Sequence, residues 1–401
     1  HRGIAHYTKE MARALHSRGA KLSLLTQHAI DRRTRFVSQT VRKQIEAKQI
    51  FESLEFGKRA DNQRKLTSFT KSILTLKSSV IDIDGGLTEN ITYAGSRLEY
   101  LKYFDRIVSL RDIFGMSYTR ARFPYLSPPS VRAGELDLVI TSCPLFIKPP
   151  RGVTLLQTVH DMFAIESHNH REDFFTFLRR LEACKNCPKI YVSTTVMRKY
   201  ETLFSPSKDK VPQYAVACQP PSLTLKDVRI QSKLKKQIFF CNAIEPRKNV
   251  KAIVMAFLNS KYRKRYTLLL AGPISDRRYA EALFNSIGGC RSVRYLGEVS
   301  DYDKSRYMLE SEMFIVGSFS EGFGIPFLDA CCLGMPVLAS DIPSHREIAA
   351  MFDFGKYSIL AEPSMEGISR GLDELYKSKT DNSPRNRYER YMKYSEAIRE
   401  Q

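Results

Sequence analysis

The sequence predicts an α/β fold with two doubly wound domains, in which parallel strands alternate with helices. The chain has 401 residues, which is long for one average domain and suits two. Hydrophobic residues make up 43% of it, enough apolar material for two cores. Short continuous apolar runs, typical of parallel strands covered on both faces, alternate with helical patterns in both halves.

The first domain is predicted over residues 1–222, with 29–134 poorly placed. Because its first helix comes before any strand, the first N-terminal strand is expected to be missing. Residues 98–114 fit an amphipathic helix by their apolar spacing. Further helices are expected at 7–17 and 194–203, and strands at 21–26, 136–141, 153–159 and 190–193.

The second domain is predicted over residues 237–383, after a charged junction at 223–236. A charged helix at 384–401 is expected to follow and to cross back to the first domain. The strands of the second domain are expected at 237–241, 266–270, 292–295, 313–316 and 337–339, and its helices at 249–257, 278–287, 303–311 and 326–333.

Charge favours an anionic partner. The 63 Lys and Arg residues exceed the 43 Asp and Glu residues and give a formal charge of +20. Nucleotide phosphates, acidic lipid headgroups and nucleic acid all fit this balance. Nucleic acid is not expected, because no zinc-finger, helix-turn-helix or RNP-type pattern is present. No run reaches the roughly 18 apolar residues of a membrane span.

The cysteines indicate a cytoplasmic protein with reduced thiols. Most of the eight lie in apolar, strand-like or helical contexts, and they do not form a disulfide pattern. Cys184 and Cys187 lie near His168 and His170, but this spacing does not fit a zinc finger. The sequence therefore predicts no metal site.

A glycine-rich loop with two acids is the most informative motif. The stretch SEGFGIPFLDACCLGMPVLASD begins at Ser320, directly after a predicted strand. Ligands of open α/β sheets bind beyond the carboxyl ends of strands, and a helix N-terminus favours anions. Glu321 and Asp329 would repel phosphate. They are therefore expected to face sugar hydroxyls, from which carboxylates readily accept hydrogen bonds. The combination predicts a nucleotide-sugar site; an ordinary strand–helix turn with solvated acids is the alternative.

A second strand end carries complementary charge. The segment IEPRKNV begins at Ile244 and follows the first strand of the same domain. Arg247 and Lys248 are placed to meet a diphosphate. A solvated basic first turn is the alternative, but the helix dipole disfavours it.

Together these motifs resemble the family-4 glycosyltransferases. The run EGFGIPFLDACCLGMPVLAS is similar to the family's Glu-x7-Glu signature, and IEPRKN to its phosphate-binding turn. Further similarities are GIAHYT from Gly3, TVHD from Thr158, VSTT from Val192 and VRYLGEVS from Val293. The resemblance implies the GT-B fold, with two Rossmann-like domains facing a cleft. It also implies sugar transfer with retention of configuration, without a metal or other cofactor.

Residue roles follow from the resemblance by position. Glu321 would contact the donor sugar, Asp329 the nucleotide ribose, and Lys248 the diphosphate. His160 would face the transferred sugar from the other domain, and Gly3 would lie near the phosphates. The loop residues expected to bind the donor are Gly322, Phe323, Gly324 and Ile325.

Three positions depart from the family pattern. Asp329 stands where the family has a second Glu. Asn242 lies near the position of a family Arg, whose role Arg247 would take. The N-terminal loop reads Gly-Ile-Ala and lacks the family's second glycine.

The sequence therefore predicts a hexosyltransferase of cell-surface polysaccharide or glycolipid synthesis. Its acceptor would be a glycan or a lipid-linked glycan. Basic residues crowded between Lys58 and Lys77 suggest an anionic membrane surface on the cytoplasmic side as a further partner, and a solvated, partly disordered loop is the alternative. A nucleotide-sugar-binding protein without turnover is the main alternative, and a nucleic-acid-binding protein is a weaker one.

Overall fold

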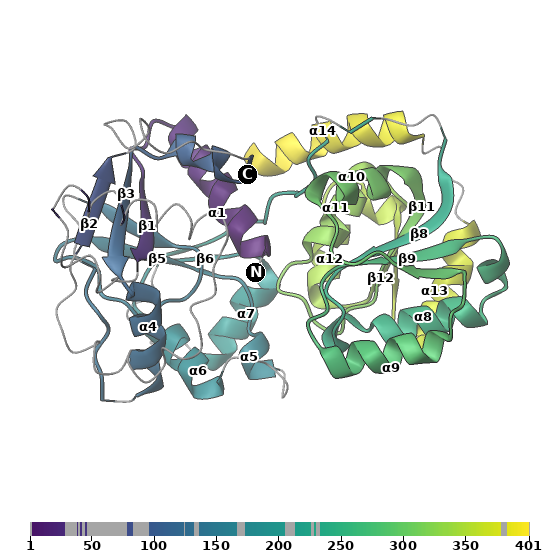
Figure 1. Ribbon diagram of the computed structural model, residues 1–401, viewed down its shortest axis with the longest axis horizontal. Coiled ribbons are helices and arrows are strands. Elements are labelled where there is room, and N and C mark those ends of the chain that lie inside the picture. Colours follow the sequence, from purple (N-terminus) through teal and green to yellow (C-terminus); the bar gives the residue numbers. More distant parts are fainter. Residues whose placement is uncertain are drawn as a thin grey trace. The chain divides into compact units, whose positions relative to one another are not determined.

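The computed structural model describes residues 2–28, 38, 41, 45, 78–82, 96–123, 125–131, 136–166, 173–204, 213–225, 228–229, 233–377 and 383–400 (Figure 1). The predicted basic segment at 58–77 and the residues His168 and His170 lie outside this part of the chain. Two compact units are present: residues 1–191 with 200–215, and residues 192–199 with 216–401. None of the helices described here combines the length and apolar character that crossing a membrane requires.

The first unit begins with helix α1 (Arg2–Ser17) and a three-stranded sheet of order β1-β3-β2. Strand β1 (Ser23–His28) pairs in parallel with β3 (Arg106–Arg111), and β2 (Ser78–Asp82) pairs antiparallel with β3. The antiparallel strand is absent from the sequence prediction, which left this region unassigned.

The predicted helix at 98–114 is wrong. A 3-10 helix, η3 (Ser96–Tyr103), is followed by strand β3, and helix α4 (Ile113–Arg122) starts only afterwards. Ile107 and Val108 are buried because β3 is the middle strand, bonded on both sides. A short apolar run fits helical spacing and a buried strand equally well. Here the β-branched side chains and the pairing with two neighbouring strands favour the strand.

A second, four-stranded sheet of order β4-β5-β6-β7 completes the first unit. Strands β4 (Leu138–Thr141), β5 (Thr154–Val159) and β6 (Lys189–Tyr191) are parallel, close to their predicted positions. Its other elements are α5 (Phe163–Glu166), α6 (Phe174–Ala183), α7 (Thr194–Leu203) and β7 (Tyr214–Val216), although the first half of α7 belongs with the second unit.

The second unit contains a six-stranded parallel sheet of order β10-β9-β8-β11-β12-β13. Numbered from β8, this is the order 3-2-1-4-5-6 of a Rossmann sheet. The predicted α/β class is therefore confirmed, and the second unit shows the doubly wound topology directly. Its strands are β8 (Lys235–Cys241), β9 (Thr267–Ala271), β10 (Val293–Tyr295), β11 (Ser311–Val316), β12 (Val337–Ser340) and β13 (Ser358–Ala361).

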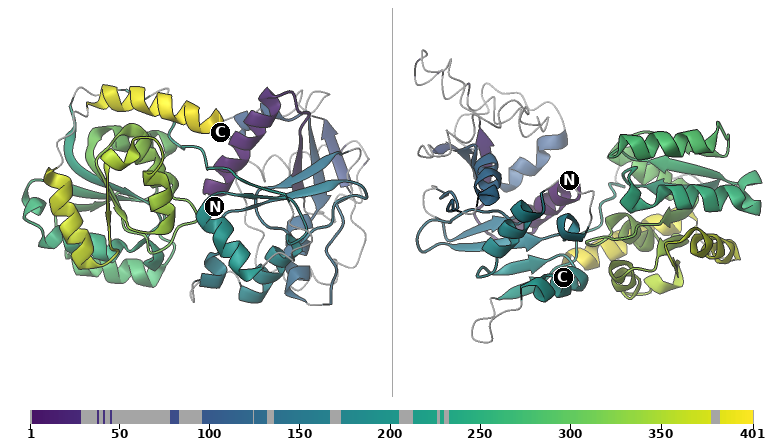
Figure 2. Two further views of the ribbon diagram at one scale, coloured as in Figure 1. Left: turned by 180° about the vertical axis from the view of Figure 1, so that it is seen from behind. Right: turned by 90° about the horizontal axis from the view of Figure 1, so that it is seen from below.

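Helices cover both faces of this sheet, as two views show (Figures 1 and 2). One face carries α8 (Val250–Asn259), α9 (Arg277–Ile287) and α13 (Met365–Lys377). The other carries α10 (Asp301–Glu310), α11 (Ile325–Leu333), α12 (Pro343–Ala349) and α14 (Pro384–Glu400). The sequence pattern did not predict β13, α12 and α13, while α8 to α11 begin within two residues of their expected positions.

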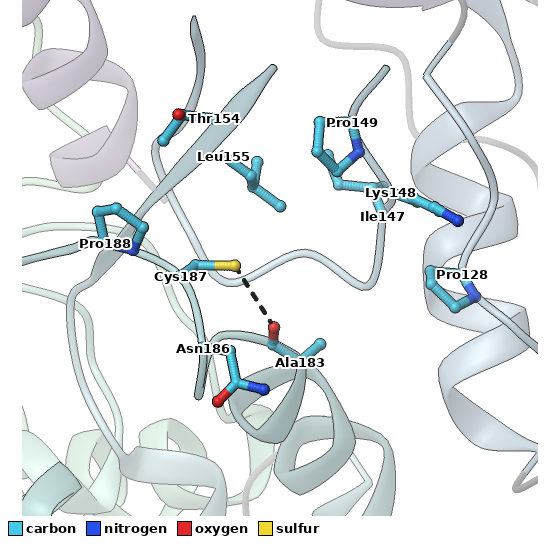
Figure 3. A pocket seen from close by; sticks show the side chains of 10 residues that line it. All are labelled: Pro128, Ile147, Lys148, Pro149, Thr154, Leu155, Ala183, Asn186, Cys187 and Pro188. Carbon is cyan, nitrogen blue, oxygen red and sulfur yellow. Dashed lines mark hydrogen bonds between the residues drawn. The ribbon is translucent and has the colours of Figure 1, made fainter. Parts of the chain in front are cut away.

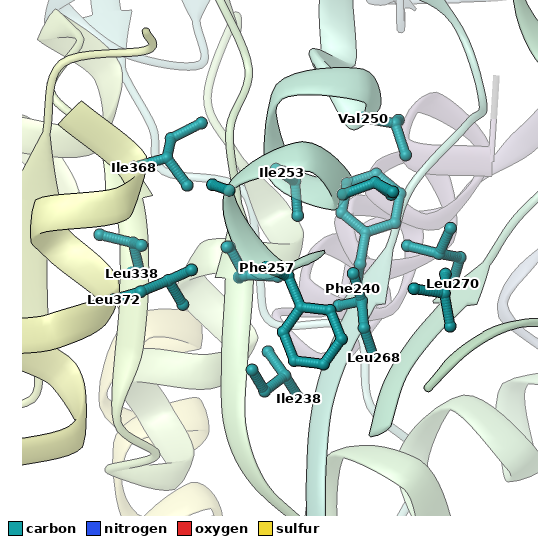
Figure 4. Close-up of a cluster of buried hydrophobic side chains, with 14 of the residues drawn as sticks. Ile238, Phe240, Val250, Ile253, Phe257, Leu268, Leu270, Leu338, Ile368 and Leu372 are labelled. Atoms are coloured by element: carbon teal, nitrogen blue, oxygen red, sulfur yellow. The ribbon is translucent and has the colours of Figure 1, made fainter. Parts of the chain in front are cut away.

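The core of the second unit lies between the sheet and helices α8 and α13 (Figure 4). Ile238, Phe240 and Leu270 project from the sheet, and Ile253 and Phe257 meet them from α8. All five side chains are almost completely removed from water. Burial of each contributes roughly 1.5–3 kcal/mol, and the packing fixes the strand ends at which the candidate site residues lie.

The segments at the two ends of the second unit are the predicted junction before it and the charged helix after it. The junction predicted at 223–236 includes Leu223, Leu225 and Val228, which are buried, so this segment is part of the second unit. Charged neighbours masked these spaced apolar residues. The terminal helix α14 forms as predicted and packs on α10 and α11 of the second unit.

Candidate functional site

Two loops of the second unit meet at one edge of its sheet. Strand β8 leads to the 3-10 helix η4 (Pro246–Lys248) and α8, and β11 leads to the glycine-rich loop and α11. The two strands are parallel neighbours, so their carboxyl ends lie side by side. The strand order reverses between them, which is the point where open α/β sheets bind ligands. Phe319 N donates a hydrogen bond of 2.9 Å to Arg247 O and joins the loops.

The predicted acid and the two predicted cations form one cluster. Lys248 Nζ lies 2.5 Å from Glu321 Oε1, and Arg247 lies 3.3 Å from Glu321 Oε2. Ser318 Oγ donates a third bond, of 2.7 Å, to Glu321 Oε1. Arg247 also pairs with Glu245 at 2.8 Å and donates to Ser320 O at 2.9 Å. The structure thus brings together three residues that the sequence placed in two separate motifs.

The electrostatics of the cluster keep Glu321 ionised. Burial by itself would raise the pKa of this carboxyl, but Lys248 and Arg247 outweigh it and lower the pKa to about 2. Only 7% of the Lys248 side chain is exposed, so its charge is little screened by water. Arg247 keeps 25% of its side chain exposed and is the more accessible cation.

The glycine-rich loop ends at the N-terminus of α11. Gly324 has φ of 117°, which only glycine adopts without strain, and it precedes the first helical residue, Ile325. The N-cap residue of α11 is this glycine, which has no side chain to cap the helix, and the first N–H groups of a helix are directed toward its N-terminal end. Gly322 and Phe323 are buried within the loop. These residues form the type of backbone surface that binds phosphate.

Asp329 lies apart from this cluster, inside the unit. Its side chain has no exposed surface and pairs with Lys304 Nζ at 2.7 Å. Its other oxygen accepts a bond from Ser222 N, and Ser222 Oγ donates a further one, both 2.7 Å long. Burial opposes the charge of Lys304, but Asp329 outweighs it and raises the pKa of Lys304. This geometry does not favour the predicted ribose contact, because the side chain of Asp329 has no surface exposed to a ligand.

His160 and Gly3 belong to the first unit and are described separately. His160 follows β5 at its carboxyl end and is 7% exposed. Burial lowers its pKa to about 4, against a smaller opposing effect of a backbone hydrogen bond with Ser142, so the ring is neutral at pH 7. Tyr7 of α1 meets the ring edge-on, with centroids 5.0 Å apart. Gly3 lies one turn before Tyr7 in α1.

The first unit has a hollow at the amino ends of strands β5 and β6 (Figure 3). It encloses about 460 Å³. Thr154 and Leu155 at the start of β5 and Pro188 just before β6 line it, whereas His160 follows the end of β5. Because the hollow and His160 lie at opposite ends of β5, the hollow is not expected to take part in the chemistry of His160.

The cysteines and metal-binding groups give no further site. All eight cysteines are free thiols, and Cys184 and Cys187 donate to the carbonyls of Arg180 and Ala183. Within the described residues, no three His, Cys, Asp or Glu side chains are grouped so that they could hold a metal ion.

Sequence reasoning missed several partners of the predicted residues. Ser318 and Glu245 lie in the same two loops, and Lys304 and Ser222 hold Asp329 from distant segments. The sequence also contains a pattern that indicates one further site residue. The segment SDIPSHREIA begins at the carboxyl end of a strand, β12. Applying the strand-end argument there would have found His345 next to Gly324.

Comparison with known proteins gives matches along much of the chain. Residues 225–399 match the family model described as glycosyl transferases group 1. The O-antigen chain mannosyltransferase B of Escherichia coli is 25% identical over 238 residues, which is 55% of this chain and 60% of that protein. The serotype-specific mannosyltransferase WbdA of Escherichia coli is 32% identical over 115 residues, which is 27% of this chain and 14% of that protein.

A solved structure with a similar chain is sucrose-phosphate synthase from Thermosynechococcus elongatus. It has 17% sequence identity and a TM-score of 0.47, and the match covers 62% of this chain and 66% of that one. The chain thus spans three fifths or less of the length of the two mannosyltransferases. The predicted resemblance is confirmed at the level of the family model, because residues 225–399 match the model of the group 1 glycosyltransferases.

Proposed function

We propose that the chain transfers a hexose-type sugar from a nucleoside-diphosphate sugar to an acceptor hydroxyl, with retention of configuration. The observation that carries the proposal is the cluster of Arg247, Lys248 and Glu321 beside the open N-terminus of α11. It lies at the reversal point of a Rossmann sheet, within the range that matches the family model. Cations, the N–H groups of a helix N-terminus and a carboxylate together suit a ligand that is phosphate at one end and hydroxyl-rich at the other.

In the proposed reaction the bond between the anomeric carbon and the β-phosphate oxygen breaks, and its electron pair goes to the departing diphosphate. The acceptor oxygen bonds to the same face of the anomeric carbon and gives its proton to the departing phosphate. Arg247, Lys248 and the N–H groups of Phe323, Gly324 and Ile325 stabilise the developing negative charge. Glu321 accepts hydrogen bonds from the sugar and keeps both cations in place.

We also assign His160 to the transferred sugar and Gly3 to the phosphate side, as the resemblance implies. A neutral imidazole with a pKa of about 4 can accept or donate a hydrogen bond to a sugar hydroxyl without adding charge. Asp329 is assigned a supporting role beneath the loop because Lys304 and Ser222 occupy its carboxylate.

The reaction is proposed to need no metal, because the two cations supply the positive charge near the diphosphate. Cell-surface polysaccharide or glycolipid synthesis is the proposed setting, and it rests on the O-antigen mannosyltransferases among the relatives. A glycan or lipid-linked glycan acceptor, a cytoplasmic location and docking on an anionic membrane surface complete the proposal.

A screen of UDP-, GDP-, ADP- and dTDP-sugars by thermal shift tests the donor site. A nucleotide sugar at a hundred times its dissociation constant stabilises the protein by about 2.7 kcal/mol. Transfer of radiolabelled sugar from the stabilising donor to a glycan acceptor, with and without EDTA, then tests the reaction. Absence of stabilisation by all four donor classes would refute the proposed function.

A second candidate function is nucleotide-sugar binding without turnover. It is favoured by the pairing of Lys248 with Glu321, since each group already has a partner of opposite charge. Stabilisation by a donor together with neither transfer nor donor hydrolysis would support this candidate over the enzyme.

A further inference from the structure

The turn between β6 and α7 contacts the glycine-rich loop directly. Its sequence is VSTT, from Val192 to Thr195, and residues 192–199 group with the second unit. Ser193 is completely buried. Its hydroxyl donates a bond of 2.7 Å to Gly322 O and accepts one of 3.1 Å from Val196 N. The carbonyl of Gly322, in the middle of the candidate donor loop, is therefore fixed by a side chain more than a hundred residues away in sequence.

Helix α12 holds this turn in place. Glu347 Oε1 accepts a bond of 2.7 Å from Thr194 N, and Oε2 accepts bonds from Thr195 N at 3.2 Å and Thr195 Oγ1 at 3.1 Å. Two first-turn N–H groups of α7 are thereby satisfied by one carboxylate, which is also favoured by the helix dipole.

The same helix also contacts the loop itself. His345 is completely buried, and a Cβ placed on Gly324 would lie 3.1 Å from its Cδ2 atom. His345 Nδ1 lies 2.9 Å from Ser340 O, so this nitrogen carries the proton. Burial lowers the pKa of His345, although the nearby Glu321 opposes this effect, and the ring is neutral. Ser193 thus holds Gly322 through a hydrogen bond, His345 lies next to Gly324, and Glu347 joins the turn to the helix that carries His345.

We propose that Ser193 and Glu347 are positioning residues of the donor loop. They set the orientation of the Gly322 peptide and, through it, the direction of the N–H groups that follow. The role in catalysis rests on the proposed function, whereas the role in ordering the loop does not. Neither side chain is assigned a contact with substrate.

The first test measures amide hydrogen exchange of residues 319–325 in the protein without donor. Ser193→Ala removes the bond to Gly322 O, and Glu347→Gln turns an amide N–H toward one of the N–H groups of α7. We expect exchange in the loop to rise by roughly 3- to 10-fold in Ser193→Ala, the effect of about one buried hydrogen bond, and by less in Glu347→Gln. Exchange in β8 and β9 should stay unchanged.

Matched controls are Ser369→Ala and Glu374→Gln on α13, because Ser369 Oγ donates to Met365 O within its own helix and Glu374 is exposed. These variants should exchange like the wild type. If Ser193→Ala lowers the yield of folded protein, Glu347→Gln, which alters a partly exposed side chain, carries the test. Loop exchange equal to wild type in folded variants would overturn the proposal.

The second test uses the nucleotide sugar that stabilises the wild type. A displaced loop should raise KM for this donor by a similar 3- to 10-fold and leave KM for the acceptor unchanged. A general loss of folded enzyme would lower kcat alone. If no donor stabilises the wild type while the variants still loosen the loop, the proposed function fails and the positioning role stands.

Discussion

Lys248 is the residue whose substitution tests the candidate site most directly. Lys248→Met keeps the apolar length of the side chain and removes its charge. Transfer should fall by about 10²–10³-fold, the usual cost of removing one electrostatic donor at the transition state. The free energy of unfolding should fall by about 3 kcal/mol, because Glu321 stays buried without its nearer cation. Steady-state kinetics and chemical denaturation measure the two effects.

The control for this variant is Lys251→Met, one turn along and exposed on α8. It should leave both quantities close to wild type. Retention of more than half of wild-type turnover in Lys248→Met would contradict the assignment of Lys248 to the diphosphate.

The two acids of the signature should respond differently to neutralisation. Glu321→Gln should abolish most turnover, because this side chain lies in the loop beside both cations. Asp329→Asn should mainly lower the free energy of unfolding, by about 3 kcal/mol, because Lys304 loses its buried partner. Asp373→Asn on the exposed face of α13 is the control. Loss of turnover in Asp329→Asn with unchanged stability would reverse the two roles.

Glu321 also predicts a pH dependence of stability. Its pKa in the folded protein, about 2, lies below the ordinary value of 4.5. The unfolded chain therefore binds the proton first, and the contribution of Glu321 is fully present above about pH 4.5 and lost as the pH falls toward 2. The free energy of unfolding, measured by denaturation and plotted against pH, should have a different slope in the wild type and in Glu321→Gln within this window. Above pH 6 the two plots should run parallel. Parallel curves throughout would argue against the ionised cluster.

At the scale of elements, α14 is joined to the sheet by Arg387. This side chain is completely buried and donates to the carbonyls of Met308, Ser311 and Glu312, where α10 ends and β11 begins. Charge-assisted bonds satisfy carbonyls that the end of a helix leaves without partners. The charge pattern of the sequence predicts the helix, and only its packing shows what the helix holds.

Arg387→Met should lower the free energy of unfolding by about 3 kcal/mol or more, because the carbonyls at the end of α10 and the start of β11 lose a charged donor. Arg385→Met is the matched control, since Arg385 is exposed and its pair with Glu389 is a surface pair worth about 0.5 kcal/mol or less. Urea denaturation measures both variants. Equal stabilities would show that α14 is held by its apolar contacts alone.

At the scale of the whole molecule, the charge of +20 exceeds what the candidate donor cluster uses. Each basic residue near an anionic membrane contributes about 1 kcal/mol to binding, so a few are sufficient for reversible attachment. The protein should co-sediment with vesicles that contain phosphatidylglycerol and remain in solution with phosphatidylcholine vesicles. Salt at about 0.5–1 M should release it, because charges are then screened within a few ångströms. Indifference to both vesicle types at low salt would refute docking.

The sequence by itself determined the features that depend on local pattern. Continuous apolar runs located most of the strands of the second unit, and Pro326 and Gly334 marked the two ends of α11. Glycines, acids and cations at strand ends identified Glu321, Arg247 and Lys248, because the residues that follow a strand are adjacent to it in the sequence. The same reasoning gave the resemblance that the family model bears out.

Only the tertiary structure decided which partners these residues have. Local spacing predicted a helix at 98–114, but pairing with two neighbouring strands made Arg106–Arg111 the middle strand of a sheet. Asp329 matched a ribose-binding acid by position, yet Lys304 and Ser222 engage it from segments 25 and 107 residues away. Ser193 reaches Gly322 across 129 residues. Sequence pattern records the period of one segment, whereas a hydrogen bond between distant segments depends on how the whole unit packs, which no local pattern contains.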